Sequence, residues 1–203
     1  KFLPDADVLI DFTNPDSALK NLDVARLLKK SVIIGTTGFI SEQKDKISEI
    51  AKDIAIVLSP NMSVGVNLLF KLVEEVAGRI PDYDIEMVEL HHNKKKDSPS
   101  GTAVKLSEIA AKAIGKNISD VGVYGRKSVM AERKKDEIGI LSVRAGDIVG
   151  DHNVYFAGPG EMLTLTHRAH SRDTFAAGAV RAAKWIMGKE PGLYDMQDVL
   201  GLK

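Results

Sequence analysis

The amino-acid sequence predicts an α/β protein with a parallel sheet, followed by an α+β part with a mixed sheet. Three short apolar runs alternate with helical patterns between residues 8 and 61, and strands separated by helices pair in parallel. Beyond residue 137, apolar and polar residues alternate with period two, and no long helix separates these later segments. Consecutive strands of this kind favour antiparallel or mixed pairing, which predicts the second part.

The first strand is predicted at Val8-Leu9-Ile10, and the first helix is predicted to begin near Pro15. Proline suits the first turn of a helix, and the polar residues before it are candidate caps. The helix continues along an apolar face with helical spacing, formed by Ala18, Leu19, Leu22, Val24, Ala25 and Leu28.

Two further strands are predicted at Val32-Ile33-Ile34 and at Ile54 to Leu58, with a charged helix from Ser41 between them. Ligands of parallel sheets bind beyond the carboxyl ends of the strands. Small or polar residues follow all three strands: Asp11-Phe12-Thr13, Gly35-Thr36-Thr37-Gly38 and Ser59-Pro60-Asn61-Met62. They would let a ligand approach the backbone, although the segment from Gly35 to Gly38 could equally be a tight turn.

The later elements follow from the same periodicities. They are an amphipathic helix from Leu68 to Ile80, a strand from Ile85 to Leu90, a helix from Ala103 to Ile114, and strands at Ile138 to Val143, Asn153 to Phe156 and Met162 to His167. An Ala-rich helix from Phe175 to Met187, ended by Gly188 and Pro191, closes the predicted order.

The composition excludes several classes of protein. Lys and Arg number 28 and Asp and Glu number 28, which argues against a dedicated nucleic-acid or membrane-surface protein. Cysteine is absent, so disulfides and thiolate sites are excluded, which is compatible with a cytoplasmic protein. No apolar run is long enough to span a bilayer, and the acidic residues after Lys1 do not fit a signal peptide.

The densest polar cluster runs from Glu89 to Ala103, from the end of a predicted strand into the start of a predicted helix. Ser100 is a good N-cap, and Gly101 and Thr102 would expose backbone N–H groups that favour anions. Two histidines and three lysines lie just upstream: His91, His92, Lys94, Lys95 and Lys96. Together these residues predict a pocket for a small, multiply anionic ligand such as a dicarboxylate, with proton donors beside it.

Simpler interpretations stay open for each feature. A lysine triplet is usually a solvated loop, and Ser-Pro-Ser-Gly is usually only a helix start. No metal site is predicted at His91 and His92, because adjacent residues rarely both reach one metal and the i, i+4 spacing is absent. His152, His167 and His170 are interpreted as structural histidines, and Arg172 is either an anion ligand or a surface ion-pair partner.

The segment from His91 to Ala103 resembles the signature of dihydrodipicolinate reductase, also called 4-hydroxy-tetrahydrodipicolinate reductase. In that signature two histidines precede a lysine and an Asp-x-Pro-Ser-Gly-Thr-Ala run. Further segments resemble motifs of the family in the same order: Asp11 to Pro15, Gly35 to Gly38, Asn61 to Asn67, Arg144 to His152, His167 to Arg172, Phe175 to Ala179 and Pro191 to Tyr194. The resemblance covers nearly the whole chain.

The resemblance implies an enzyme of lysine and diaminopimelate biosynthesis with a Rossmann-type nucleotide domain. Such an enzyme uses NADH or NADPH to reduce the cyclic dicarboxylate derived from hydroxy-tetrahydrodipicolinate to tetrahydrodipicolinate, and water is lost. His91 matches the family's proton donor and acceptor, and Lys95 matches its proton donor. Substrate ligands are matched by His92, Ser100, Gly101 and Thr102.

The resemblance also implies which residues contact the cofactor. The loop near the nicotinamide ribose is matched by Gly35, Thr36 and Thr37, and the strand end that lines the nicotinamide is matched by Ser59, Pro60, Asn61 and Met62. Met62 stands where the family commonly has an aromatic residue, and a soft Met side chain should preserve the packing there.

A larger departure concerns the pyrophosphate of the cofactor. The chain contains no G-x-G-x-x-G or related loop, and family members begin with such a loop after their first strand. Since the first residue is Lys rather than Met, we hypothesise that the sequence is a fragment of a longer enzyme. Standing alone, it should bind the cofactor poorly.

The predicted organisation is a partial dinucleotide-binding domain at 1–62 and a substrate-binding and oligomerisation domain at 63–172. A C-terminal helix at 173–203 would return to the first domain. The family resemblance implies a homotetramer, and no nucleic-acid, membrane or metal partner is expected. Two alternatives remain: another two-domain dehydrogenase of amino-acid metabolism, which would need a different cluster, and a truncated, non-catalytic assembly or binding domain of the same fold.

Overall fold

The computed structural model describes residues 5–128 and 131–203, and these residues form two compact units. Unit 1 contains the chain up to Asn67 and again from Asp173 to Lys203, while unit 2 contains Leu68–Arg172. The sequence predicts a domain boundary after residue 62, whereas the first segment of unit 1 extends to Asn67. The predicted boundary stays a prediction. In the part of the chain that the structure describes, no helix combines the length and the apolar character that a membrane crossing requires.

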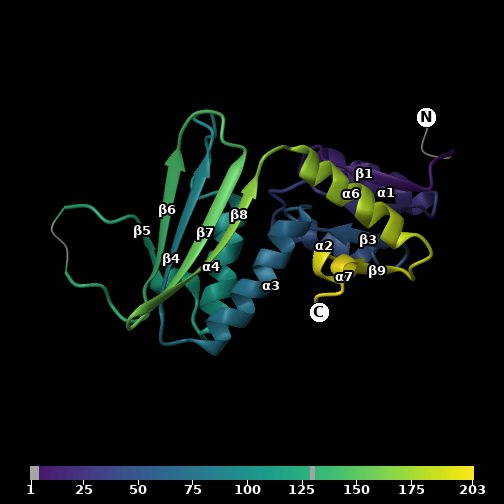
Figure 1. The fold of residues 1–203 in the computed structure, drawn as a ribbon. Coiled ribbons are helices and arrows are strands. Elements are labelled where there is room, and N and C mark those ends of the chain that lie inside the picture. The colour runs from purple at the N-terminus through teal and green to yellow at the C-terminus, as the bar shows by residue number, and fades with distance from the viewer. Residues whose placement is uncertain (1–4, 129–130) are drawn as a thin grey trace. The chain divides into compact units, whose positions relative to one another are not determined.

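Unit 1 is built on a four-stranded parallel sheet with the strand order β1-β2-β3-β9. The strands are β1 (Val8–Asp11), β2 (Ser31–Ile34), β3 (Ala55–Leu58) and β9 (Gly192–Tyr194). The helices are α1 (Pro15–Leu27), α2 (Ser41–Ile50), α6 (Asp173–Ile186) and α7 (Met196–Leu200). Figure 1 shows α6 against one face of this sheet.

Alternation along the strands of unit 1 produces two cores, one on each face of the sheet. Ile34 packs with Leu22 of α1 and Ile47 of α2. The neighbouring residue Ile33 points to the opposite face and packs with Ala182 and other residues of α6 and α7. Helices therefore cover both faces, as expected for a parallel sheet with apolar strands.

The start of α1 confirms the cap that the sequence predicts. The Asn14 side chain accepts a hydrogen bond from the backbone N–H of Ser17 at 3.1 Å, and Pro15 occupies the first helical turn. Proline has no N–H to satisfy, so it fits a position where the helix offers no partner.

Unit 2 contains a five-stranded mixed sheet with the order β5-β6-β4-β7-β8. Its elements are β4 (Asp84–His91), α4 (Gly101–Ala113), α5 (Ile118–Val121), β5 (Gly122–Tyr124), β6 (Ile138–Arg144), β7 (Gly150–Gly158) and β8 (Glu161–Ala169), and α3 (Val64–Arg79) leads into it. β4 and β5 each pair in parallel with β6, whereas β4, β7 and β8 pair antiparallel. The predicted mixed sheet is confirmed.

The two faces of the mixed sheet differ in burial. Ile85, Met87, Val154 and Phe156 alternate onto one face and are buried, and Figure 1 shows α4 on one side of the sheet. Among the described residues, no helix covers the other face in Figure 1. Exposed apolar side chains such as Leu141 remain there.

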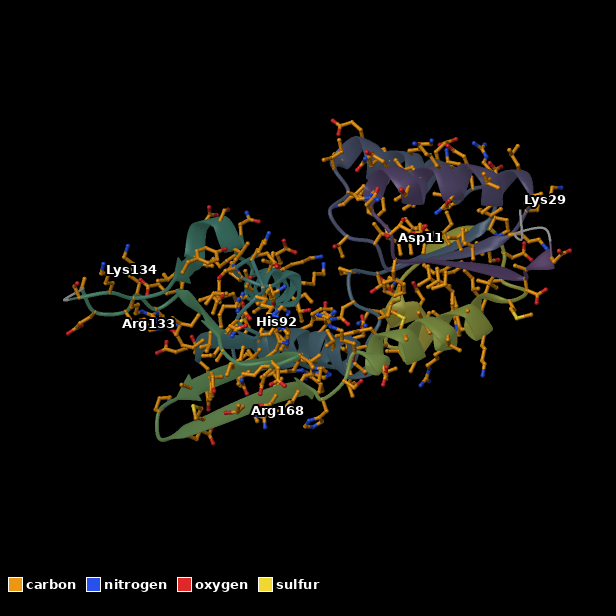
Figure 2. All side chains as sticks on the ribbon, turned by 90° about the horizontal axis from the view of Figure 1, so that it is seen from above. Asp11, Lys29, His92, Arg133, Lys134 and Arg168 are labelled. Atoms are coloured by element: carbon orange, nitrogen blue, oxygen red, sulfur yellow. The ribbon has the colours of Figure 1, made fainter. Side chains whose placement is uncertain are left out.

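The long segment between β5 and β6 is tied to β4 by ion pairs on that open face. Arg126 binds the Glu86 carboxylate with two hydrogen bonds of 2.8 Å, and Arg133 reaches Asp84 at 2.6 Å and Glu86 at 3.1 Å. Figure 2 shows Arg133 and Lys134 on this extended loop. The ion pairs fix the base of the loop to the sheet.

The prediction that the Ala-rich helix closes the chain is wrong. After α6, the chain adds β9 to the parallel sheet beside β3 and then forms α7, which ends at Gly201 in the left-handed conformation. The prediction also omitted α5 and β5 in unit 2. These elements are three to five residues long, too short for either periodicity to show.

Candidate active site

The candidate site of unit 2 begins at the carboxyl end of β4. Side chains alternate along this strand, so Glu89 and His91 point to the same face as the buried Met87. Glu89 is 1% exposed and His91 is 9% exposed. A carboxylate buried this deeply requires several polar partners.

Glu89 has partners from three segments of the chain. The Nδ1 atom of His91 lies 2.5 Å from Oε2, and the Arg144 guanidinium of β6 donates to Oε1 at 2.7 Å and to Oε2 at 2.9 Å. The backbone N–H of Ser100, at the start of α4, donates to Oε1 at 3.1 Å. Burial by itself raises the pKa of Glu89, but the hydrogen bonds from His91, Arg144 and Ser100 outweigh burial and hold this pKa well below its ordinary value.

His152 faces Glu89 from the neighbouring strand β7. Its Nε2 atom lies 3.0 Å from the Ser100 hydroxyl, and its ring meets the His91 ring edge-on with the centroids 5.2 Å apart. Burial, together with the nearby His91, lowers the pKa of His152 to about 4. The ring is therefore neutral near pH 7, and its Nδ1 atom has no hydrogen-bond partner among the described residues.

Ser100 caps α4, as the sequence predicts, and both of its donor groups face protein partners. Its hydroxyl oxygen accepts from the N–H of Ala103 at 3.2 Å and contacts His152, while its own N–H binds Glu89. Gly101 is exposed and Thr102 is half-buried in the first turn that follows. Gly101 and Thr102 follow Ser100 in the first turn of α4, where backbone N–H groups and the helix dipole favour anions.

The predicted proton donor Lys95 lies in the loop between β4 and α4. Its Nζ atom is 2.8 Å from both carboxylate oxygens of Asp97, and this hydrogen bond lowers the pKa of Asp97. The Lys95 N–H donates to the backbone oxygen of His92, which is half-buried at the end of the strand. Arg144 also binds the backbone oxygen of Asp97, so the loop is anchored to β6.

The predicted cofactor residues of unit 1 follow β2 and β3 at the carboxyl edge of the parallel sheet, where β1 also ends. Asp11 ends β1 and is 3% exposed; it accepts from the Thr36 hydroxyl at 2.8 Å and from Asn21 at 2.7 Å. Burial raises the pKa of Asp11, but these hydrogen bonds lower it overall. Figure 2 shows Asp11 in the sheet with a helix on either side of it.

Gly35, directly after β2, lies against the ring of Phe12. A Cβ atom at this position would overlap that ring, which is half-exposed beside it. A side chain at position 35 would therefore require the Phe12 ring to move. Thr37 is exposed next to it, whereas the Thr36 side chain is occupied by Asp11.

The segment after β3 folds into a tight turn. The Ser59 hydroxyl donates to the Asn61 oxygen at 2.8 Å, and the Asn67 amide donates to the same oxygen at 2.8 Å. Pro60 is exposed. The Met62 side chain is 1% exposed and packs in the core with α6, so any ligand contact at this position would come from the Met62 backbone.

Among the described residues of unit 1, the carboxyl edge of the sheet has exposed positions, whereas the start of α1 does not suit a pyrophosphate. Thr37 and Pro60 are exposed and Gly35 is half-buried at the carboxyl edge of the sheet, where ligands of parallel sheets bind. A pyrophosphate needs free N–H groups at a helix start, whereas α1 is capped by Asn14, begins with proline and carries Asp16 in its first turn. In the described part of the chain, no cluster of His, Asp and Glu has the arrangement that would hold a metal ion.

Sequence reasoning missed three members of the unit 2 site. Glu89 and Arg144 lie inside recognised segments without an assigned role, and His152 is interpreted from the sequence only as a structural histidine. The spacing of Glu89 and His91 was the available signal, because residues two apart in a strand share a face.

Two family models match the chain. One is described as "Dihydrodipicolinate reductase, N-terminus" and matches residues 1–62, and the other is described as "Dihydrodipicolinate reductase, C-terminus" and matches residues 65–200. Together these two models cover nearly all of the chain.

Curated relatives and a solved structure agree with the family models. A 4-hydroxy-tetrahydrodipicolinate reductase of Trichlorobacter lovleyi is 60% identical over 97% of this chain and 74% of its own length, and one of Geotalea daltonii is 57% identical over the same shares. A dipicolinate-bound dihydrodipicolinate reductase from Paenisporosarcina sp. TG-14 is 27% identical with a TM-score of 0.77, covering 96% of this chain and 73% of that structure.

Proposed function

This chain belongs to the dihydrodipicolinate reductase family, and on that premise we propose that it carries out the family's reaction. In this reaction hydroxy-tetrahydrodipicolinate loses water, and the resulting cyclic dicarboxylate takes a hydride from NADH or NADPH and a proton to give tetrahydrodipicolinate. The observation that carries this proposal is the buried Glu89–His91 pair bonded to the start of α4. Glu89 connects His91, the proposed proton-exchanging group, to the start of α4, where carboxylates are attracted.

The start of α4 is proposed to bind one substrate carboxylate. Gly101 and Thr102 lie in the first helical turn, where N–H groups and the helix dipole favour anions. His92 and Ser100 are proposed to complete the contacts to the substrate. A planar dicarboxylate held in this way presents a fixed ring to the reacting groups.

His91 and Lys95 are the proposed proton-exchanging residues. Reduction of a ring carbon requires a proton on the neighbouring atom, and a positioned side chain supplies it more readily than water does. Asp97 holds the Lys95 ammonium in place at 2.8 Å. A dicarboxylate that approached this ammonium would be attracted by its charge.

The nicotinamide supplies the hydride when it is bound. Gly35, Thr36 and Thr37 are proposed to contact its ribose, and the turn of Ser59, Pro60, Asn61 and Met62 is proposed to line its ring. The exposed Thr37 and Pro60 support this assignment, because they lie at the carboxyl edge of the sheet, where ligands of parallel sheets bind.

We further propose a homotetramer that assembles through the open face of the unit 2 sheet. Leu141 and Val143 of β6 are 41% and 39% exposed there, and Met162 of β8 is 60% exposed. A sheet face with this many exposed apolar side chains needs a cover, and a second copy of the same face would supply one.

The direct test is a coupled assay on the full-length polypeptide with freshly generated substrate and either cofactor. Oxidation of NADH or NADPH that depends on the substrate is the expected result. Assembly without any turnover would instead favour the non-catalytic alternative.

A further inference from the structure

We propose that Glu89 is a positioning residue that decides which ring nitrogen of His91 exchanges the proton. The inference rests on the proposed function, in which His91 exchanges a proton with the substrate. It adds a residue to which neither the sequence motif nor the resemblance gave a role. The argument depends on contacts within unit 2.

The hydrogen bond between the two residues fixes the tautomer of His91. An ionised carboxylate can only accept, so Nδ1, at 2.5 Å from Oε2, must carry a hydrogen. The hydrogen on Nδ1 stays in place whether the ring is neutral or protonated. Nε2 is then the atom that gains and loses the proton, as acceptor in the neutral ring and donor in the charged ring.

Gly150 keeps that nitrogen uncovered. It lies at the start of β7 beside the His91 ring, and a Cβ atom at position 150 would stand 3.2 Å from Nε2. Any larger side chain would extend over Nε2 or displace the ring. Gly150 therefore leaves space beside Nε2, which is the nitrogen that Glu89 leaves to exchange the proton.

Arg144 and Ser100 keep Glu89 in its accepting form. A buried carboxyl without partners takes up a proton and could then donate to Nδ1, which would reverse the tautomer. The two hydrogen bonds from Arg144, at 2.7 and 2.9 Å, and the Ser100 N–H, at 3.1 Å, oppose that protonation. His152, packed edge-on to His91, is neutral near pH 7 and adds no competing charge.

The same carboxylate joins the two halves of the substrate site. Oε2 holds the ring that exchanges the proton, and Oε1 holds the N–H of the residue that caps α4. The distance between the proton-exchanging ring and the carboxylate-binding helix start is therefore fixed by one rigid side chain. Arg144 braces that side chain from β6.

The test compares Glu89→Gln with Glu89→Asp in the full-length enzyme. In Glu89→Gln the amide oxygen takes the place of Oε1, which accepts from both Arg144 and Ser100, and the NH2 group takes the place of Oε2. There it loses the second Arg144 hydrogen bond and donates to Nδ1 of His91, which forces the His91 proton onto Nε2. We expect kcat to fall about 100-fold while KM changes less than about threefold, since proton transfer and not binding is affected. Glu89→Asp keeps the charge and should recover part of the loss.

Glu86→Gln is the matched control, because Glu86 lies on the same strand, points to the opposite face and is also bound by arginine, in its case Arg126 and Arg133. Its kcat should stay within about twofold of the parent value. Equal losses of kcat in the two glutamine variants would show a general structural effect and overturn the proposal.

A second readout is independent of activity. Nitrogen-15 spectra of histidine-labelled protein, without substrate or cofactor, should show the His91 proton on Nδ1 in the parent and on Nε2 in Glu89→Gln, with the signal assigned by its loss in His91→Gln. The same tautomer in both proteins would refute the positioning role. A tautomer change in a protein that shows no reductase activity would instead refute the proposed function alone.

Discussion

Lys95 combines a partly exposed ion pair with a proposed chemical role. Its side chain is 20% exposed and that of Asp97 is 63% exposed, so water screens the pair and the pair contributes little to folding. We expect Lys95→Ala to lower kcat by about 10² to 10⁴-fold, the usual contribution of a general acid. The free energy of unfolding should change by less than about 0.5 kcal/mol. Steady-state kinetics and urea titration give the two numbers, and an unaltered kcat would remove the acid role.

Thr102 should affect substrate binding more than turnover. Its proposed contact is with a carboxylate at the start of α4, and a hydrogen bond to a charged group contributes about 1.5 to 3 kcal/mol. Thr102→Val is therefore expected to raise KM about tenfold with a smaller change in kcat. Initial rates over a range of substrate concentrations would show this, and an unchanged KM would argue against a contact between Thr102 and the substrate carboxylate.

His152 makes stability depend on pH. The pKa of this buried residue is about 4 in the folded protein, against the ordinary value of 6.5. Between these values the unfolded chain binds the additional proton, so stability falls as pH falls from 6.5 toward 4, by at most about 1.4 kcal/mol per pH unit.

Replacing His152 with Gln should flatten this dependence. Urea unfolding at intervals from about pH 5.5 to 7.5 measures it, at least about one unit above the ordinary pKa values of carboxylates in the unfolded chain. His167, whose pKa is also lowered by burial, supplies part of the slope that remains. Identical slopes in the parent and the variant would contradict the assignment to His152.

The sequence predicted some residues of the site and not their partners. Ser100 was predicted as a cap from local chemistry alone, and the structure confirms the cap. The resemblance singled out His91. Glu89 could not be given a role in the same way, because its partners lie 11 positions away at Ser100 and 55 positions away at Arg144. Only the folded sheet brings these groups together.

Among the elements, α6 lies unusually close to the turn after β3. A Cβ atom at Gly178 would overlap the backbone oxygen of Met62, so the helix and the turn touch through backbone atoms. An alanine normally stabilises a helix relative to glycine by about 1 kcal/mol. At this position the collision reverses the sign.

Gly178→Ala should lower the free energy of unfolding by about 1 to 3 kcal/mol. Gly78→Ala in α3 is the matched control, because nothing lies within 4 Å of its added Cβ, and it should stabilise by up to about 1 kcal/mol. Denaturant titration of both variants measures the difference. Stabilisation by both would mean that α6 does not pack this tightly.

Elements with a strong local pattern were predicted best. The strands β2 and β3 carry β-branched residues, and α1 begins with an Asn-Pro pair, so each is recognisable without its neighbours. The strand β9 has three residues and forms because β3 offers a free edge. Such an element depends on tertiary contacts and leaves no periodic pattern in the sequence.

For the whole molecule, the open sheet face makes a prediction about assembly. Leu141 of β6 is 41% exposed on that face. Leu141→Lys should convert the proposed tetramer into smaller species, because each interface would bury unpaired charges. Leu27→Lys is the control, since Leu27 is 83% exposed on α1 of unit 1 and is not part of the unit 2 sheet. Sedimentation velocity distinguishes the species, and a tetramer that persisted in Leu141→Lys would contradict the proposed interface.

The way Glu89 is held also bears on how activity emerges during folding. Its partners come from β4, the cap of α4 and β6, and β6 pairs with β4 in parallel only after the chain has passed through α4, α5 and β5. Contacts with such long separations in sequence form slowly, because a large loop must close before they do. Helices can form earlier than this pairing. Refolding chains should therefore regain helical signal before the proton-exchanging ring reaches its working orientation, so recovered turnover reports the closing of the sheet.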